Sequence, residues 1–253
     1  MKIRSPKNKF DLKIAPADRV LEIGGGHNPH PRANVVVDKY TDNNEHRSSA
    51  LKLYRNQQFV HADGEQLPFK DAEFDYIICT QVLEHVNDPV RFLSEQFRVA
   101  RRGYIDTPSL LGENLFPKKT HKWILHELSG VLYLLDKSKL SFGDGYDFGE
   151  LMLQYLPTHS IGFKILERTH RNLFTIRIEW EQDFSYEVNP SDPDILQYFN
   201  QQWKQEWAAQ FFPPKSLLRE CGDTLWALTD ITLSICKSRL FPSRFKNFPQ
   251  NHS

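Results

Sequence analysis

The fold is decided by a short apolar run that ends in three glycines, residues 20–26, VLEIGGG. An unalternated run of this kind is typical of a strand buried on both faces, as in a parallel sheet covered by helices. Glycines directly after such a strand let a ligand approach the backbone where a Cβ would clash. The stretch therefore predicts a ligand-binding turn at the carboxyl edge of a parallel sheet.

The residues that follow continue this strand pattern. Further short apolar runs lie at residues 35–37, 59–62, 74–79 and 103–105. A helix is expected to begin at Pro89, because Asn87 or Asp88 can cap it and proline suits the first helical position. A second helix is expected within residues 44–57. Only residues 27–33 separate the glycines from the next strand, so the first crossover helix is predicted to be very short or missing.

The second half of the chain follows a different pattern. Residues 121–136 predict a hairpin, residues 163–168 and 173–180 two strands, and residues 194–237 mostly helix. A glycine-rich loop covers residues 142–146, and the end from residue 241 is expected to fray. The predicted fold class is α/β: a Rossmann-like sheet with helices on both faces, an inserted β-hairpin and a helical C-terminal extension. We divide the chain into a lead-in segment (1–18), a main domain (19–180, with residues 108–160 inserted) and the extension (181–253).

The composition excludes several classes of protein. The 253 residues hold 32 Lys and Arg against 32 Asp and Glu, which disfavours a nucleic-acid binder or membrane anchor that works by bulk positive charge. No apolar run approaches the roughly 18 residues of a membrane span, and the N-terminus lacks the apolar region of a secretory signal. The cysteines, Cys79, Cys221 and Cys236, form no C-x-x-C pair. We expect a reduced, cytoplasmic protein without disulfides.

The glycine turn points to a nucleotide-like cofactor. Asp38 ends the second predicted strand, where a carboxylate can accept both hydroxyls of a ribose. Gly24 and Gly26 fit a G-x-G pattern, but Pro29 stands where a dinucleotide fingerprint has glycine or alanine. The pattern therefore disfavours NAD.

Four motifs, in order and at sensible spacing, together resemble the class I S-adenosylmethionine-dependent methyltransferases, of the methyltransferase type 11 kind. They are residues 20–26 (VLEIGGG), 35–38 (VVVD), 62–69 (ADGEQLPF) and 74–86 (FDYIICTQVLEHV). The resemblance covers residues 19–107. It implies that S-adenosyl-L-methionine is the cofactor.

The resemblance also assigns roles to the cofactor-binding residues. Glu22 and the turn of Gly24, Gly25 and Gly26 would line the methionine part, and Asp38 would hold the ribose. Asp63, Gly64 and Glu65 would face the adenine, and Thr80 and Gln81 would form the floor beside the sulfonium. The third glycine of the family pattern is Asn28 here. The methionine carboxylate would then need another anchor, for which His27, Asn28 and Lys39 are the candidates.

Candidate catalytic residues follow the fourth predicted strand. The sulfonium already activates the methyl group, so the protein must mainly align an acceptor, and a hydroxyl acceptor also needs a base. His85 stands at the expected place and is of the type best suited to that role. Alternatively, Glu84 and His85 only fix the loop and the helix cap.

A metal site is the second hypothesis for this region. Small-RNA terminal 2′-O-methyltransferases carry Glu-x-x-Glu-His after strand four and a later His, which together hold a divalent metal. The matching positions are Gln81, Glu84, His85 and His121. With one carboxylate lost, Glu84, His85 and His121 would favour an imidazole-binding metal over Mg²⁺. The alternatives are a metal-free remnant with His121 facing the acceptor, or an exposed hairpin that carries His121 and His126 as ordinary polar residues.

The acceptor region gives weaker signals. Aromatic residues after the cofactor half form either an acceptor lid or ordinary core. They are Trp123, Tyr133, Phe142, Tyr146 and Phe148. A later set is spaced to pack the C-terminal helices onto the sheet: Trp203, Trp207, Phe211 and Phe212. Lys118, Lys119 and Lys122 either contact a phosphate or form a solvated loop.

The sequence thus predicts a methyltransferase of class EC 2.1.1.- that methylates an oxygen of a small molecule or a sugar or glycan precursor. The alternatives are a metal-assisted RNA 2′-O-methyltransferase, which the neutral charge disfavours, and a catalytically inactive module that binds S-adenosylmethionine. The oligomeric state is left open.

Overall fold

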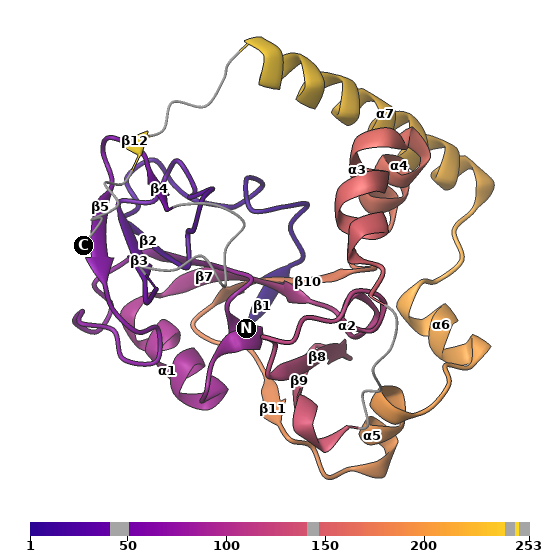
Figure 1. Cartoon of the computed structure of the whole chain (residues 1–253), viewed down its shortest axis with the longest axis horizontal. Coiled ribbons are helices and arrows are strands. Elements are labelled where there is room, and N and C mark those ends of the chain that lie inside the picture. The colour runs from indigo at the N-terminus through magenta and orange to yellow at the C-terminus, as the bar shows by residue number, and fades with distance from the viewer. Residues whose placement is uncertain (41–50, 141–146, 241–245, 248–253) are drawn as a thin grey trace.

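The computed structural model describes residues 1–40, 51–140, 147–240 and 246–247, with side chains described as far as residue 236. Figure 1 shows a strand-rich part that contains β2, β3, β5 and α1, and a helical part that contains α3, α4, α6 and α7. The predicted glycine-rich loop, and with it Phe142 and Tyr146, lies outside the described residues.

A seven-stranded sheet, in the order β1-β10-β7-β6-β2-β3-β5, forms the centre of the molecule. The five strands from β5 to β7 are parallel, and β10 pairs antiparallel with both β7 and β1. In chain order the strands are β1 (Lys2–Arg4), β2 (Val20–Ile23), β3 (Val35–Asp38), β5 (Gln58–His61), β6 (Tyr76–Thr80), β7 (Arg102–Pro108) and β10 (Thr175–Glu181). The predicted α/β class is confirmed, as are the predicted strands of the first half.

The N-terminal residues contribute to this sheet. β1 lies at its edge, and the terminal amino group of Met1 donates hydrogen bonds to the Glu181 and Asp183 carbonyls. Arg4 reaches the buried carboxylate of Glu179 on β10, with 2.6 Å between Nε and Oε2. The segment expected to be a lead-in is therefore an integral edge of the sheet.

The two faces of the sheet are covered differently. One face buries Leu21, Ile77 and Ile105 against Phe92 and Leu93 of α1 (Pro89–Val99). Asp88 caps α1 by accepting a hydrogen bond from the Arg91 amide at 3.0 Å. The other face buries a second cluster that is packed against Leu12 and Ile14 of the N-terminal segment. Among the described residues between the glycine turn and β3 there is no helix, as the short crossover predicted.

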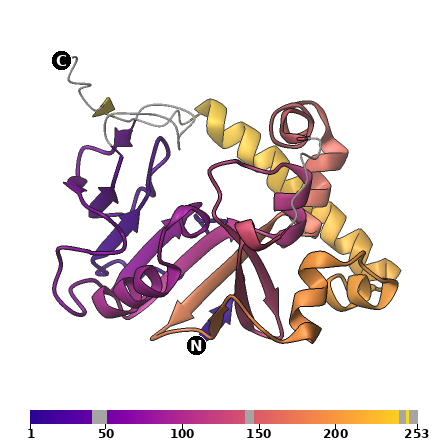
Figure 2. The same ribbon diagram turned by 60° about the horizontal axis from the view of Figure 1, so that its bottom comes forward.

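The inserted region forms a hairpin, as predicted. Strands β8 (Trp123–Leu128) and β9 (Val131–Asp136) pair antiparallel, and β11 (Tyr186–Val188) joins β9. The remaining helices are η1 (Leu83–His85), α2 (Leu110–Leu115), η2 (Lys137–Lys139), η3 (Glu150–Tyr155), α3 (Leu156–His159), α4 (Ile161–Thr169), α5 (Pro193–Asn200), α6 (Gln205–Phe211) and α7 (Leu217–Leu240). Figure 2 shows α7 running across the helical side of the molecule.

Two predicted elements are wrong. Residues 163–168 are helical in α4 and not a strand, since Ser160 caps the helix by accepting the Phe163 amide. The described part of the helix expected within 44–57 contains strand β4 (Lys52–Leu53), which pairs with β12 (Lys246–Asn247). The pairing with β12 also gives structure to part of the end that was expected to fray.

His126 is not on an exposed hairpin. It is 5% exposed and packs among aromatic rings, with Phe211 and Trp203 at centroid distances of 4.6 and 5.8 Å. Burial lowers its pKa to about 4, so the ring is neutral near pH 7. Trp203 and Phe211 thus hold the C-terminal helices against the hairpin and not against the central sheet, which is a correction to the predicted packing.

In the part of the chain that the structure describes, no helix combines the length and the apolar character needed to cross a membrane.

Two glycines give opposite predictions for stability. A Cβ at Gly103 would lie 2.5 Å from Trp180 Cζ2 and 2.6 Å from Ile77 Cγ2, whereas Gly222 in α7 has nothing within 4 Å of its Cβ position. We expect Gly103→Ala to lower the free energy of unfolding by about 1–3 kcal/mol through overpacking. Gly222→Ala should raise it by up to about 1 kcal/mol, because alanine is the better helix former. Chemical denaturation of both variants measures these shifts, and an unchanged midpoint for Gly103→Ala would contradict the packing described.

Candidate functional site

The candidate site lies where the parallel strands end. Ile23 of β2 pairs with Val37 of β3 and Cys79 of β6, so the residues that follow all three strands meet at one edge. Gly24 begins the turn at φ +68°, and a Cβ there would lie 2.3 Å from Val82 Cγ2. This turn therefore depends on glycine for both its backbone conformation and its contact with the loop after β6.

A pocket opens at this edge. Its empty space is about 750 Å³ including the open mouth, within the usual range for small-molecule sites. Eight of the predicted site residues line it: Gly24, Asp38, Lys39, Asp63, Gly64, Glu65, Gln81 and His85. The sequence analysis missed further lining residues, of which Tyr40 and Asn87 are polar. Tyr40 could have been predicted as a lining residue, because it lies two residues beyond Asp38 in the sequence.

Lys39 and Asp63 form an ion pair beside the pocket, with 2.6 Å between Nζ and Oδ2. The hydrogen bond that Lys39 donates to Asp63 raises the pKa of Lys39. Partial burial opposes ionisation of Asp63, but hydrogen bonds from Lys39 and the Glu65 amide leave its pKa below the usual value. Lys39, a candidate anchor for the methionine carboxylate, is thus paired with Asp63, which is predicted to face the adenine.

The remaining predicted cofactor residues do not line this pocket. Glu22 lies buried in β2, where its carboxylate accepts the His30 amide at 2.5 Å and lies 3.5 Å from Lys9 Nζ. Gly25 and Gly26 are buried, whereas His27 and Asn28 are exposed. Glu22 therefore holds the loop that follows the glycine turn.

The loop after β6 is held by β7. Gln81 has φ +55°, and its Nε2 donates to Asp106 Oδ1 at 2.6 Å. Thr80 ends β6 with a buried hydroxyl that has no hydrogen-bond partner among the described residues. Gln81, the first position of the expected four-residue metal pattern, is thus hydrogen-bonded to Asp106 on β7.

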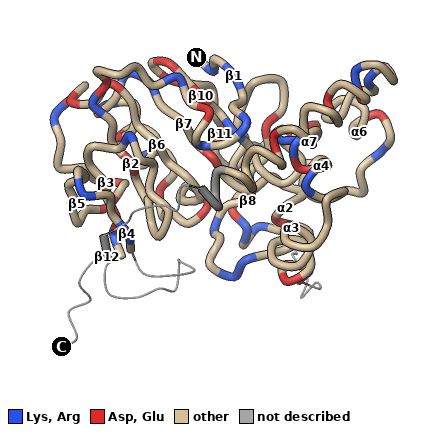
Figure 3. Tube along the Cα trace, turned by 90° about the horizontal axis from the view of Figure 1, so that it is seen from above, with Lys and Arg blue, Asp and Glu red and all other residues tan. Residues whose placement is uncertain are grey.

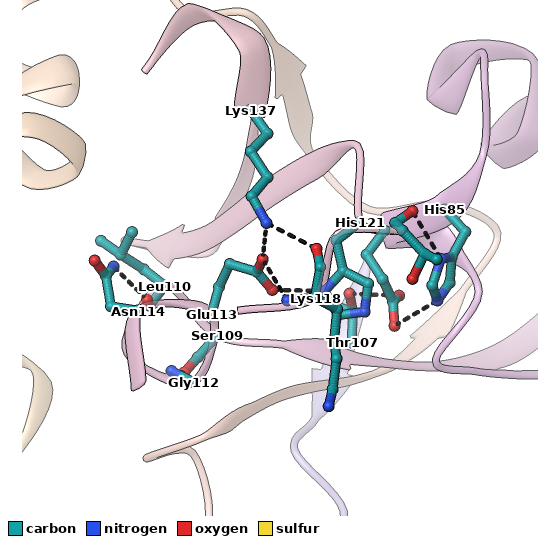
Figure 4. A network of polar contacts seen from close by, with 12 residues as sticks. His85, Thr107, Ser109, Leu110, Gly112, Glu113, Asn114, Lys118, His121 and Lys137 are labelled. Carbon is teal, nitrogen blue, oxygen red and sulfur yellow. Dashed lines mark hydrogen bonds and ion pairs between the residues drawn. The ribbon is translucent and has the colours of Figure 1, made fainter. Parts of the chain in front are cut away.

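Those other three side chains come together. Glu84 and His85 are on η1, and His121 lies two residues before the start of β8. The candidate ligand atoms of Glu84, His85 and His121 lie within 4.8 Å of one another. The two imidazole rings meet edge to face, with 4.7 Å between their centroids. Figure 4 shows His85 and His121, with the acidic side chain of Glu113 beside His121.

Glu113 was not predicted from the sequence, and it organises this cluster from α2. It is 2% exposed, and Ser109 caps the short helix that carries it. Oε2 lies 2.5 Å from His121 Nδ1, and Oε1 accepts a hydrogen bond from Lys137 Nζ. Burial opposes its ionisation, but these two partners leave the pKa of Glu113 below the usual value. An ionised Glu113 therefore orients His121.

Glu84 is in a different electrostatic situation. It is fully buried; Oε2 accepts from Thr107 Oγ1 at 3.0 Å, and Oε1 has no hydrogen-bond partner among the described residues. Burial raises the pKa of Glu84 to about 8, since no cation compensates it. The pKa values of the two buried carboxyls in this network are thus shifted in opposite directions.

The histidines share one tautomer. His85 Nδ1 lies 3.1 Å from the Thr120 carbonyl oxygen, which can only accept, and His121 Nδ1 faces the Glu113 carboxylate. A neutral imidazole that donates through Nδ1 carries its lone pair on Nε2. Each ring therefore has Nε2 as its basic or ligating atom.

A second pocket adjoins the first, and the two share Asn87. Its lining combines polar and apolar side chains: Asn87, His121, Lys122, Trp123, Asp136, Lys137, Ser138 and Leu140. His85 lines the first pocket and His121 the second, so the histidine pair stands between them. His121 is largely buried, with a side chain 9% exposed, which excludes the exposed-hairpin alternative.

Only some of the predicted lysine cluster and of the candidate aromatic lid line the second pocket. Lys122 lines the second pocket and donates to Asn87 Oδ1, whereas Lys119 is exposed. Trp123 also lines it and is fixed by a 2.8 Å hydrogen bond from Nε1 to the Val86 carbonyl. Phe148 is 45% exposed and lines neither pocket.

Comparison with known proteins finds similarity over part of the chain. Residues 33–105 match the family described as a methyltransferase domain. The chain is 34% identical to an uncharacterized protein of Methanocaldococcus jannaschii over 41% of this chain and 53% of that one. It is 33% identical to an uncharacterized methyltransferase of Mycolicibacterium vanbaalenii, over 33% of this chain and 35% of that one.

A ubiquinone/menaquinone biosynthesis C-methyltransferase of Rickettsia typhi is also 33% identical, over 37% of this chain and 40% of that one. A solved structure of a possible histamine N-methyltransferase from Thermotoga maritima is 25% identical over 40% of this chain and 48% of that one, with a TM-score of 0.31. The chain thus spans about half or less of the length of the curated relatives it matches.

Proposed function

We propose that this chain, which carries a domain of the class I S-adenosylmethionine-dependent methyltransferase family, transfers a methyl group to a hydroxyl oxygen of a polar small molecule such as a sugar or glycan precursor. One observation carries the proposal. The His85–His121 pair lies between a pocket at the carboxyl edge of the sheet and a second pocket that meets it at Asn87.

The first pocket is assigned to the cofactor. Asp38 ends β3 and is 8% exposed, a position from which a carboxylate can accept ribose hydroxyls. The Asp63–Glu65 segment and Tyr40 line the same space and would face the adenine end. The methionine end would lie over Gly24 and Gln81. The lining residues therefore fit a nucleoside carrying a short charged tail.

The second pocket is assigned to the acceptor. Lys122, Asp136, Lys137 and Ser138 give it hydrogen-bonding groups of both kinds, and Trp123 adds an aromatic surface. Such a lining suits an acceptor with several hydroxyls better than an apolar ring. This favours oxygen as the acceptor atom.

The proposed chemistry needs one base. The sulfonium of the bound cofactor supplies an already activated methyl group. His121 Nε2 accepts the hydroxyl proton as the acceptor oxygen bonds to the methyl carbon and the carbon–sulfur bond breaks. Glu113 then lies against the protonated ring and stabilises its charge, as the carboxylate does in a Ser-His-Asp triad. Lys137 keeps Glu113 ionised and in place.

The cofactor assignment is tested by binding. We expect Asp38→Ala to weaken the binding of S-adenosylmethionine by roughly 10–100-fold, because it removes hydrogen bonds to a charged acceptor. Isothermal titration calorimetry measures this. Asp71→Ala is the matched control, since that carboxylate is 82% exposed and does not line the pocket. Equal affinity in the native protein and Asp38→Ala would place the ribose elsewhere.

The base is tested by separating binding from turnover. We expect His121→Ala to lower kcat by about 10²–10⁴-fold, with an unchanged Kd for S-adenosylmethionine. Glu113→Gln should lower kcat less and displace the pH profile, since it acts through His121. The exposed His159 on α3 provides the control variant His159→Ala. Turnover is followed as S-adenosylhomocysteine formed with a panel of sugars and nucleotide sugars.

Two results would contradict this function. Full activity in His121→Ala would exclude His121 as the base. Tight cofactor binding by the native protein, with no turnover on any hydroxyl acceptor, would support the alternative of an inactive binding module.

Metal-assisted transfer, including transfer to a ribose 2′-hydroxyl of RNA, is the second candidate. The observation that favours it is the convergence of Glu84, His85 and His121. The residues fit a metal ion, because Glu84 Oε1 is buried without a hydrogen-bond partner among the described residues, 3.9 Å from His85 Nε2, and each imidazole presents Nε2. Glu113 and the Thr120 carbonyl would orient the two rings from behind, as is usual around metal-bound histidines. Two imidazoles and one carboxylate suit Zn²⁺ or Mn²⁺ better than Mg²⁺.

Metal content distinguishes the two candidates. If the cluster is a metal site, the protein dialysed against Zn²⁺ or Mn²⁺ should retain about one ion per chain by elemental analysis. The variants His85→Ala and His121→Ala should lose it, and His159→Ala should keep it. A protein that retains no ion, and whose turnover is unaffected by a chelator, would leave His121 as a base and exclude the metal.

A further inference from the structure

A second group of basic side chains lies away from the site already described, between α4 and α7. The groove there is lined by four cations, Arg168, Arg171, Lys215 and Arg219, and by one carboxylate, Asp223. In a chain whose charges balance overall, this is a local excess of positive charge. Figure 3 shows Lys and Arg segments where α4 and α7 approach each other.

Two of the four cations have carboxylate partners. Lys215 Nζ lies 2.7 Å from Asp223 and also donates to the Thr169 carbonyl. Arg168 lies 2.8 Å from Asp230. These ion pairs hold Arg168 and Lys215 in place. Because each is paired with a carboxylate, neither contributes much positive charge to a ligand.

The other two cations have no such partner. Arg171 lies over the ring of Trp226, 4.9 Å from its centroid, and Lys7 approaches the same ring at 4.1 Å. A cation–π contact holds a guanidinium in place without neutralising it. Arg171 and Arg219 make no ion pair within the described ranges of the chain. The groove therefore presents two guanidiniums that lie near Asp223 without forming an ion pair with it.

The amino end of α7 adds to this field. Ser216 caps the 24-residue helix, and Lys215 and Arg219 flank its first turn. The unpaired amides and the dipole of a helix amino end favour an anion. Guanidiniums at such an end match the geometry of phosphate oxygens.

We propose that this groove is a binding site for a phosphate-bearing small molecule, distinct from the methyl-transfer site. Arg171 and Arg219 would contact the phosphate oxygens, and the half-buried rings of Phe212 and Trp226 would border any ring attached to it. Arg171 lies in the segment between α4 and β10. The first residue of β10, Thr175, pairs with Pro108 at the carboxyl end of β7. The phosphate site thus lies on the same edge of the sheet as the cofactor pocket.

The test is a titration of the full chain with inorganic pyrophosphate at about 0.1 M salt, where exposed charges are screened beyond about 10 Å. Calorimetry should show saturable binding to one site per chain. We expect Arg171→Ala and Arg219→Ala each to weaken it by about 10-fold. Lys119→Ala removes one exposed positive charge elsewhere and should leave it unchanged.

Further arms identify the ligand and separate this proposal from the proposed function. Tighter binding of UDP than of pyrophosphate would indicate a nucleotide, and equal binding a phosphate alone. Asp38→Ala should not affect pyrophosphate binding, so loss of cofactor binding and loss of phosphate binding are seen independently. The proposal is overturned if binding is not saturable, or if Lys119→Ala weakens it as much as the arginine variants do.

Discussion

The parallel pairing of β2 with both β3 and β6 is the constraint on which the site depends. Because β2 lies between them in register, the glycine turn, Asp38 and the loop after β6 must end at one edge. Strand order reverses at this point, which is where open α/β sheets bind ligands. Gly24 makes the closest approach, and its contact with Val82 fixes the distance between the two loops.

The first half of the fold was predictable because its signals are local. Each parallel strand is a short apolar run bounded by polar or glycine residues, and α1 begins with a proline behind a capping aspartate. The errors arose where the context is tertiary. In α4, Phe163, Lys164 and Ile165 alternate as a strand would, yet Ser160 caps a helix that packs on α7. β1 has only three residues, and its strand character comes from pairing with β10, about 175 residues away.

The same distinction holds for the site. Glu84, His85 and His121 were predicted from a resemblance in spacing, and the structure brings them together. Glu113 could not be found in this way, because no motif connects a glutamate in a six-residue helix with a histidine in the next loop. It becomes part of the site because β7, which contacts η1, ends at Pro108, and Ser109 caps α2 directly after it. The role predicted for Glu22 stays a prediction, and the structure adds a contact that the motif does not give, the hydrogen bond from the His30 amide to its carboxylate.

The balance of charge within the cluster explains how it can support either of two chemistries. Glu113 is compensated by Lys137 and His121, so its charge serves to orient an imidazole. Glu84 has no compensating cation and keeps one buried oxygen unused beside His85. A base mechanism needs only the first of these arrangements, and for it Glu84 is a structural residue bound to Thr107. A metal mechanism needs both arrangements. A divalent cation would then supply the positive charge that is missing beside the Glu84 carboxylate.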